Sequence, residues 1–265
     1  MLDRTKVPTR IEALLSHQRL LILAGPMAAA ILCWAWLVPA SIDMYGPMDG
    51  LSAWMMDARW DWSYGLLIFT MWVVMMVGMM LPALAPTLLL FAAVCRSDAA
   101  GGSPVLRVYA FAAGYLGVWV GFSVLATLLQ WQLARGQMMT PMMTLDSSRL
   151  GAAALVFAGL YQWTSLKQNC LARCQSPAAF ISSSWRPRAK GALQMGAAYG
   201  LFCLGCCWAL MLLLFVGGVM SLWCIGLITL LVLVEKLAPW GRAGLRLSGG
   251  LLIGAGAFLF AQSLA

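Results

Sequence analysis

The sequence predicts an all-α fold, a polytopic bundle of about seven membrane-spanning helices, with six as the alternative. Of its 265 residues, 62% are hydrophobic and only 10% are charged. An ordinary soluble domain is about 45–50% apolar and about 25% charged, so this chain has too few polar side chains to cover a water-facing surface. Because apolar runs recur along the whole chain, residues 20–265 are predicted to form one membrane domain behind a cytoplasmic segment, residues 1–19. A soluble enzyme is excluded.

Each expected helix corresponds to one apolar run, since a helix needs about 20 mostly apolar residues to cross the hydrocarbon layer. The sixth run is short and follows the fifth across Gly217 and Gly218, so the two form either a tight hairpin or one broken helix. Pro82 and Pro86 each remove a backbone donor from the second run and are expected to kink it. The seven candidate spans are Leu20–Val38, Tyr64–Val94, Val105–Leu133, Leu150–Ser165, Ala192–Val216, Leu222–Val234 and Leu245–Leu264.

The basic residues predict the orientation of the chain. Lys and Arg concentrate in the cytoplasmic loops of membrane proteins. With the N-terminus inside, only Arg59, Arg135 and Arg149 fall in outer segments, and an odd number of helices places Ala265 outside. The net charge of +8 is explained in this way, so nucleic acid is not an expected partner and the lipid bilayer is. The residues expected inside are Arg4, Lys6, Arg10, Arg19, Arg96, Arg107, Lys167, Arg173, Arg186, Arg188, Lys190, Lys236, Arg242 and Arg246.

Methionine is concentrated in the two expected outer loops and in the second run. Thioether sulfur is a soft, uncharged ligand that favours Cu(I) over hard cations. In the second run, four methionines fall within an arc of about 140°. Anchoring of the loops at the headgroups and packing in an apolar core explain the same residues without a metal. The loop residues are Met44, Met48, Met55, Met56, Met138, Met139, Met142 and Met143, and the four of the second run are Met75, Met76, Met79 and Met80.

Three cysteines of the fifth run form the strongest candidate site. Cys203, Cys206 and Cys207 fall within an arc of about 100° on one helix face, with Met211 one turn beyond. Both this cluster and the methionines of the second run begin about a dozen residues into their spans, which places both near mid-membrane. A soft-ligand site shared by the two helices is therefore expected. Close packing of small residues is the alternative.

Two further cysteines, Cys170 and Cys174, lie in the expected cytoplasmic loop after the fourth run. Their spacing puts both on one face if the loop is helical, and Lys167 and Arg173 are expected to lower the pKa of both thiols. The cytoplasmic side keeps them reduced. Zinc is disfavoured because the single histidine, His17, lies far from these sulfurs in the sequence. The isolated residues Cys33, Cys95 and Cys224 are expected to serve packing.

Two adjacent ionisable residues, Glu235 and Lys236, lie near the inner end of the sixth run. They are either charged anchors at the membrane edge or partners of a neighbouring helix, with a proton relay as one such use.

Four ordered motifs connect the chain to a known family: MWVVMMVGMMLP, YQWTSLKQNCLARCQSP, GLFCLGCCWALM and EKLAP. From about Trp54 to the C-terminus, the chain resembles the bacterial predicted metal-binding integral membrane proteins, a domain of unknown function labelled in places as copper chaperones. The resemblance implies a multi-pass protein of the bacterial cytoplasmic membrane that handles copper. Two positions, Gln175 and Ser221, depart from the family pattern. The sulfur positions that carry over are Met75, Met79, Met80, Cys170, Cys174, Cys206, Cys207 and Met211.

The leading functional hypothesis is a non-enzymatic membrane protein that handles copper as Cu(I), as a chaperone or conduit. Outer methionines would capture the ion, the mid-membrane sulfurs would hold it, and Cys170 and Cys174 would exchange it with a copper enzyme or carrier protein. No phosphate-binding Gly-rich loop ending in Lys-Ser or Lys-Thr is present, so ATP-driven pumping is not expected. The alternatives are a membrane thiol-disulfide oxidoreductase and a structural membrane subunit without metal.

Overall fold

The computed structural model describes residues 10–46, 60–98, 102–238 and 241–264, with side chains described from Ile22 onward. All regular elements in these ranges are helices, which confirms the all-α prediction, and one isolated β-bridge joins Met139 to Leu145. The helices are α1 (Arg10–Met44), α3 (Trp62–Ser97), α4 (Pro104–Arg135), α5 (Ser148–Gln162), α6 (Ser165–Gln175), α7 (Pro177–Ser183), α8 (Arg188–Leu212), α9 (Leu214–Gly217), α10 (Leu222–Leu237) and α11 (Gly241–Gln262).

Each of the seven apolar runs forms a helix, but among the described residues only five helices are long and apolar enough to cross a membrane. The predicted count of seven spans, with six as the alternative, is therefore not supported. Helices α5 and α10 have 15 and 16 residues, or about 22–24 Å at 1.5 Å per residue, against a hydrocarbon layer of about 30 Å. The five candidate spans are Ile22–Met44, Trp62–Ser97, Pro104–Arg135, Arg188–Gly217 and Gly241–Gln262.

Local signals explain where the short helices stop. Helix α5 ends at Gln162 because Thr164 starts a new helix there, its hydroxyl accepting a hydrogen bond from the Lys167 amide. Before α10, Gly218 has φ +95°, a backbone conformation that glycine adopts at low cost. The fifth and sixth runs are thus separate helices joined by a tight turn, not one broken helix. The second run stays helical through Pro82 and Pro86.

The helices pack mainly in the pairs α1–α3, α3–α4, α4–α8 and α5–α11. Helices α4 and α8 approach closely because glycines face the neighbouring backbone: a Cβ added at Gly114 would lie 2.0 Å from the Leu193 carbonyl oxygen, and one at Gly196 would lie 1.9 Å from that of Phe111. Small residues at helix contacts are typical of membrane bundles.

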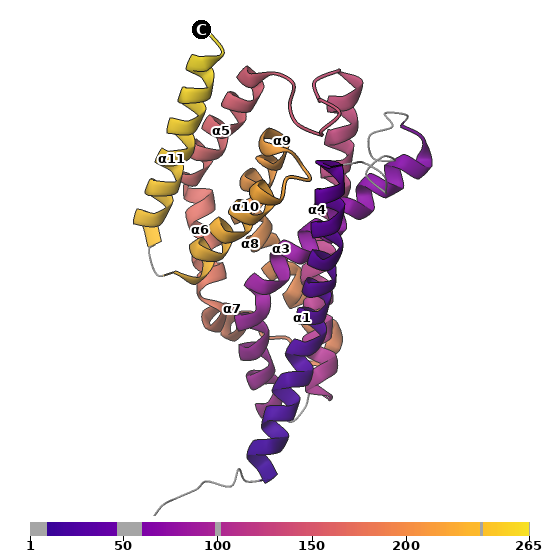
Figure 1. Ribbon diagram of the computed structural model, residues 1–265. Coiled ribbons are helices and arrows are strands. Elements are labelled where there is room, and N and C mark those ends of the chain that lie inside the picture. The colour runs from indigo at the N-terminus through magenta and orange to yellow at the C-terminus, as the bar shows by residue number, and fades with distance from the viewer. Residues whose placement is uncertain (1–9, 47–59, 99–101, 239–240, 265) are drawn as a thin grey trace, which may run out of the picture.

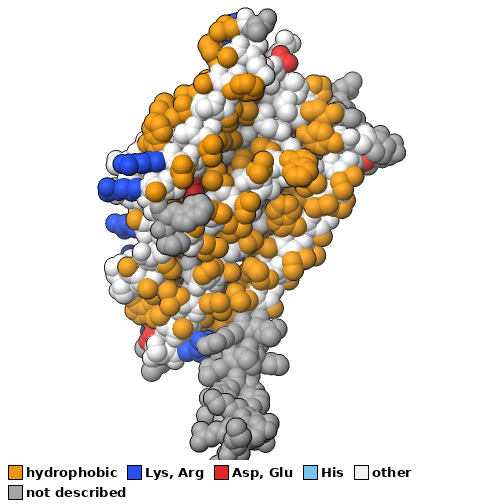
Figure 2. Space-filling view, turned by 60° about the vertical axis from the view of Figure 1, so that its left-hand side comes forward, with side chains coloured by type: hydrophobic (Ala, Val, Ile, Leu, Met, Phe, Trp, Pro, Cys, Tyr) orange, Lys and Arg blue, Asp and Glu red, His pale blue; other side chains and the backbone are white. Residues whose placement is uncertain are grey.

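The exterior is apolar where no other helix covers it. Figure 2 shows a face that is almost entirely hydrophobic, with Lys and Arg side chains at its edge. Large side chains such as Trp223, Leu251 and Phe258 are 84%, 74% and 66% exposed, while polar groups such as Lys167 and Gln162 are buried. This distribution and the five long helices identify a multi-pass membrane protein.

The first and last helices define the two ends of the bundle. Helix α1 begins at the bottom of Figure 1 and α11 ends at its top. The end where α1 begins is called the inner end below, after the predicted orientation, and the opposite end the outer end. Which end faces the cytoplasm stays a prediction, as does the cytoplasmic segment, of which residues 1–9 lie outside the described residues.

Candidate metal centre

The three α8 cysteines form a compact, buried sulfur cluster. Cys203, Cys206 and Cys207 are at most 1% exposed. The Cys206 and Cys207 sulfurs are 3.2 Å apart, and the Cys206 thiol donates to the Cys203 carbonyl oxygen at 3.1 Å. Met211, one turn further on, is fully buried. The predicted sulfur face of this helix is thus directed into the protein rather than toward lipid.

Side chains from two other helices hold Cys203. The Lys236 ammonium on α10 donates to the Cys203 sulfur at 2.7 Å, and the Tyr115 hydroxyl on α4 lies 3.0 Å from the same atom. Lys236 is only 9% exposed and Tyr115 is fully buried. Of the two alternatives for Lys236, a membrane-edge anchor is therefore wrong, and contact with a neighbouring helix is confirmed.

The two cysteines of the predicted loop join the α8 cluster. They lie on a helix, α6, as expected for a four-residue spacing. The Cys174 side chain lies close enough to Cys206 to interact with its thiol. A Cβ added at Gly205 would lie 2.8 Å from the Cys170 sulfur. Cys170, Cys174 and Cys206 thus lie at the contact between α6 and α8, whereas the sequence predicted that Cys170 and Cys174 lie apart from the α8 cysteines in a cytoplasmic loop.

The expected activation of the loop cysteines is wrong for Cys170. Burial raises the pKa of the Cys170 thiol and outweighs the opposing effect of Arg173. The two cations have other partners: the Arg173 guanidinium lies 4.6 Å from the Phe202 ring centroid, and the Lys167 ammonium is paired with Glu235. Cys170 is therefore a protonated thiol at neutral pH, whose proton must leave before the sulfur binds a metal as thiolate.

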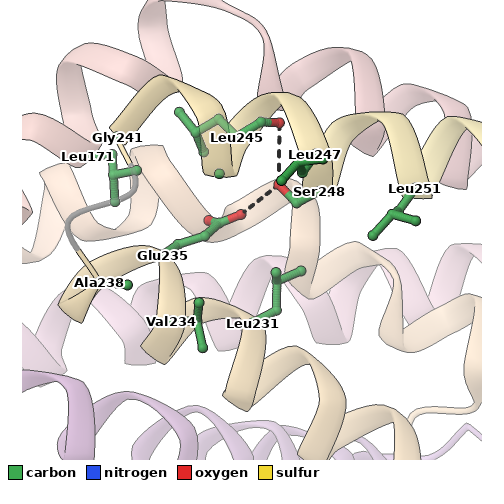
Figure 3. Close-up of a pocket in the computed structure, with 11 residues that line it drawn as sticks. Leu171, Leu231, Val234, Glu235, Ala238, Gly241, Leu245, Leu247, Ser248 and Leu251 are labelled. Carbon is green, nitrogen blue, oxygen red and sulfur yellow. Dashed lines mark hydrogen bonds between the residues drawn. The ribbon is translucent and has the colours of Figure 1, made fainter.

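Glu235 holds the inner ends of four helices together. Its carboxylate accepts hydrogen bonds from Lys167 at 2.7 Å, Gln162 at 2.8 Å and Ser248 at 3.3 Å, and its backbone carbonyl accepts one from Gln175 at 2.7 Å. Figure 3 shows the carboxylate turned toward Ser248 of α11, at the wall of an otherwise aliphatic pocket of about 280 Å³ between α10 and α11. This network fixes α6, and with it two cysteines, to α10.

Two contacts set the relative depth of α3 and the α8–α9 segment. Toward the inner end, the hydroxyls of Thr87 and Tyr199 are 3.0 Å apart. Toward the outer end, the ring centroids of Trp72 and Phe215 are 5.3 Å apart. The two intervals span about 22 Å along α3 and about 24 Å along α8–α9 at 1.5 Å per residue. The two segments therefore run antiparallel at matching depth.

This register brings the α3 methionines level with the α8 sulfurs. Met80 lies midway between the two contact residues of α3, and Cys207 lies midway between those of α8–α9. Met76 is four residues from the outer contact on α3, and Met211 is four residues from the outer contact on its own segment. All four side chains are at most 1% exposed. The pairs Met80–Cys207 and Met76–Met211 thus share a depth.

The methionines differ in which way they face. Trp72 and Thr87 mark the face of α3 directed at α8–α9, and at about 100° per residue Met76 lies within about 10° of its centre, with Met79 and Met80 within about 50°. Met75 lies about 90° from that centre, on the side where α3 packs against α1. All four are fully buried. Met76, Met79 and Met80 are the ones that face the cysteine helix.

The donor set fits a soft ion. Thiols and thioethers line the cluster, a set that selects Cu(I) and disfavours hard cations. In the described parts of the chain, no three His, Cys, Asp or Glu side chains are arranged as a metal site. Met80 and Met211 lie at the depth of the cysteine cluster and offer thioether sulfur as further soft donors.

Sequence reasoning missed Tyr115 as a partner of Cys203. No motif includes it, because the contact joins residues 88 positions apart. A weaker signal was present: a tyrosine inside an apolar span usually finds a partner for its hydroxyl.

The methionines predicted in the outer loops differ in their exposure. Met48, Met55 and Met56 lie outside the described residues. Met138 is 45% exposed, Met139 and Met142 are half-buried, and Met143 is 4% exposed. Met44 is fully buried at the end of α1. The expected outer clusters are therefore not uniform surface patches, because some of their methionines lie inside the fold.

A protein-family model matches most of the chain. The family model described as PpoB2, copper chaperone, matches residues 69–259, from α3 almost to the end of α11. The matched region starts later than the Trp54 expected from the motifs and ends before the C-terminus. Neither a curated protein nor a solved structure matches the chain.

Proposed function

The chain belongs to the PpoB2 copper chaperone family, and we propose that it carries Cu(I) on the buried sulfur cluster of α6 and α8. Cys203, Cys206 and Cys207 supply the thiolates, joined by Cys170 and Cys174 at the contact with α6. Met211 and the α3 methionines that face α8, Met76, Met79 and Met80, supply thioethers, and Met75 offers a further thioether about 90° around α3 from that face. Family membership suggests a non-enzymatic role, and the ion is cargo that is bound and released.

One observation carries this proposal: the two α8 sulfurs that are 3.2 Å apart are almost fully buried and lie at the depth of Met80 on α3. Cu(I) prefers such soft ligands. Thioethers bind more weakly than thiolates and need no deprotonation, so an ion can pass between the two ligand types by exchange. Lys236 and Tyr115 position the Cys203 sulfur during that exchange.

The partner and the location follow from the same proposal. A chaperone must deliver its ion, so the recipient is a copper enzyme or a copper carrier protein. Location in the bacterial cytoplasmic membrane, with the N-terminus inside, agrees with the asymmetry of basic residues. In this arrangement Cys170 and Cys174 lie at the depth of Gly205 and Cys206 and add their sulfurs to the cluster from the α6 side.

The test is copper binding by the purified full chain in lipid nanodiscs. Elemental analysis and X-ray absorption at the copper edge should show bound Cu(I) with sulfur ligands only. Cys206→Ser combined with Cys207→Ser should lower copper content by at least one ion per chain. Cys224→Ser, a cysteine on α10 outside the cluster, is the matched control and should leave it unchanged.

Other results would select one of the alternatives. Copper-free wild-type protein with a reversible disulfide in a redox titration would favour a thiol-disulfide oxidoreductase. Copper-free protein with no reversible disulfide, whose cysteine variants lose only stability, would favour a structural subunit. Copper content that is indifferent to the double serine variant would remove the α8 cluster as the site.

A further inference from the structure

Helices α1 and α3 meet in an antiparallel contact centred on Gly78. The Trp34 ring nitrogen donates to the Gly78 carbonyl oxygen at 3.2 Å, and a Cβ added at Gly78 would lie 3.6 Å from Leu37. Seven residues advance a helix by nearly two full turns, so a residue seven positions away lies on the same stripe. Toward the outer end, seven positions from Leu37 is Met44, and seven positions from Gly78 is Met71.

Met44 and Met71 therefore face each other across the α1–α3 contact, within about one helical turn in depth. Both side chains are fully buried. Neither residue is among the ligands proposed above for the sulfur cluster of α6 and α8, which is called the inner site below.

Two loops close over this pair at the outer end. The Val219 amide donates to the Met143 carbonyl oxygen at 3.4 Å. A Cβ added at Gly218 would lie 2.7 Å from the Tyr45 hydroxyl and 3.3 Å from Thr144. The end of α1, the loop after α4 and the turn before α10 thus meet at one place. Each carries a buried methionine adjacent in sequence to a contact residue: Met44, Met143 and Met220.

The α9 turn joins these loops to α3. The Leu145 amide donates to the Phe215 carbonyl oxygen at 2.8 Å, and the Phe215 ring packs on Trp72, the residue after Met71. Met143 and Met220 are 4% and 0% exposed. Met143 also has φ +55°, a left-handed conformation that is uncommon for any residue other than glycine. Backbone strain of this kind persists where the surrounding structure demands a particular placement.

We propose that Met44, Met71, Met143 and Met220 form a second metal site, made of thioethers alone, that takes a monovalent soft cation such as Cu(I) at the outer end. This proposal rests on the proposed function. Thioether sulfur does not form disulfides, so such a site stays competent on an oxidising side of the membrane, where thiols would be lost. The site is distinct from the cysteine cluster, which lies deeper in the bundle.

A line of thioethers connects the two sites. Met75 follows Met71 by one turn of α3, and Met79 follows Met75 by another. All three are fully buried. This gives Met75, which faces away from the cysteine helix, a role: it receives the ion from the outer site and passes it to the methionines that are level with Cys207.

The test uses Ag(I), a redox-stable soft cation, on the full chain in nanodiscs, with bound metal counted by elemental analysis and affinity measured by competition. In a Cys203→Ser, Cys206→Ser, Cys207→Ser background, at least one Ag(I) should remain bound. Adding Met44→Leu and Met71→Leu should weaken that residual binding at least tenfold. Leucine keeps the apolar volume, so the fold should be retained.

Two further variants keep the result interpretable. In the native-cysteine background, Met44→Leu with Met71→Leu should lower the stoichiometry by one ion and leave the rest bound. Met195→Leu is the matched control, since Met195 is also buried but lies near the inner end, where its sulfur accepts a hydrogen bond from the Arg186 amide. This variant should leave the number of bound ions and their affinity unchanged.

The outcomes separate the two proposals. If the paired leucine variant leaves stoichiometry and affinity unchanged in both backgrounds, the outer site is refuted while the inner copper site stands. If Met195→Leu lowers binding as much as the pair, the effect is general and the outer site is refuted as well. Wild-type protein that binds no Ag(I) overturns the proposed function itself.

Discussion

Replacing Lys167 with methionine should destabilise the protein more than any exposed charge substitution. The Lys167 side chain is fully buried, and its ammonium lies 2.7 Å from a Glu235 carboxylate that is itself only 6% exposed. Removing one partner of a buried ion pair costs about 3–5 kcal/mol, because the remaining charge is left uncompensated. Gln162 and Ser248 still donate to the carboxylate, so we expect the lower end of that range, about 3 kcal/mol.

The assay is equilibrium unfolding of the full chain in detergent micelles, followed by tryptophan fluorescence, arranged as a double-mutant cycle. Lys167→Met combined with Glu235→Gln should cost less than Lys167→Met alone, because no unpaired charge remains. Lys190→Met, at an exposed position, is the control and should stay within about 0.5 kcal/mol of the wild type.

Two results would refute the reasoning. A loss below about 1 kcal/mol for Lys167→Met would place the pair in the class of solvent-screened surface ion pairs. Costs that simply add in the double variant would show that the two side chains do not interact energetically.

The remaining predictions concern helix packing and a buried hydrogen bond, and all are measured by the same unfolding assay. Gly114→Ala should destabilise the protein by about 1–3 kcal/mol, because the added methyl group would overpack against the α8 backbone. Gly121→Ala on the same helix is the control: the added methyl group meets open space, so the change should be neutral or stabilising by up to about 1 kcal/mol. Trp72→Phe should cost about 1–3 kcal/mol because it leaves the buried Gln130 side-chain oxygen without its 2.7 Å donor; Trp62→Phe, at an exposed position, should change little.

The sequence could predict what depends on local pattern. Apolar runs located every long helix, and a period of about 100° per residue placed Cys203, Cys206 and Cys207 on one face. The fourth and sixth apolar runs already have nearly the lengths of α5 and α10, which are 15 and 16 residues long. The count of membrane spans failed because helices of this length are too short to cross the hydrocarbon layer.

Contacts between distant residues were beyond pattern reasoning. Lys167 and Glu235 are 68 positions apart, and nothing in either local sequence indicates the pair. Lys167 was therefore assigned to lowering the pKa of nearby thiols, when its charge is in fact neutralised by a carboxylate on another helix. The sequence pattern could not predict the burial of Cys170 against α8 either, because this burial depends on how α6 packs on that helix.

The adjacent residues Glu235 and Lys236 show how one short motif can serve two structural purposes. On a helix, neighbours point about 100° apart, so the carboxylate reaches α5, α6 and α11 while the ammonium reaches Cys203 on α8. The first set of contacts fixes the helix that carries Cys170 and Cys174, and the second fixes a sulfur of the central cluster. A shift of α10 would therefore move both groups of cysteines relative to each other. It follows that α10, which contributes no sulfur to the cluster, sets the geometry in which the sulfurs of α6 and α8 meet.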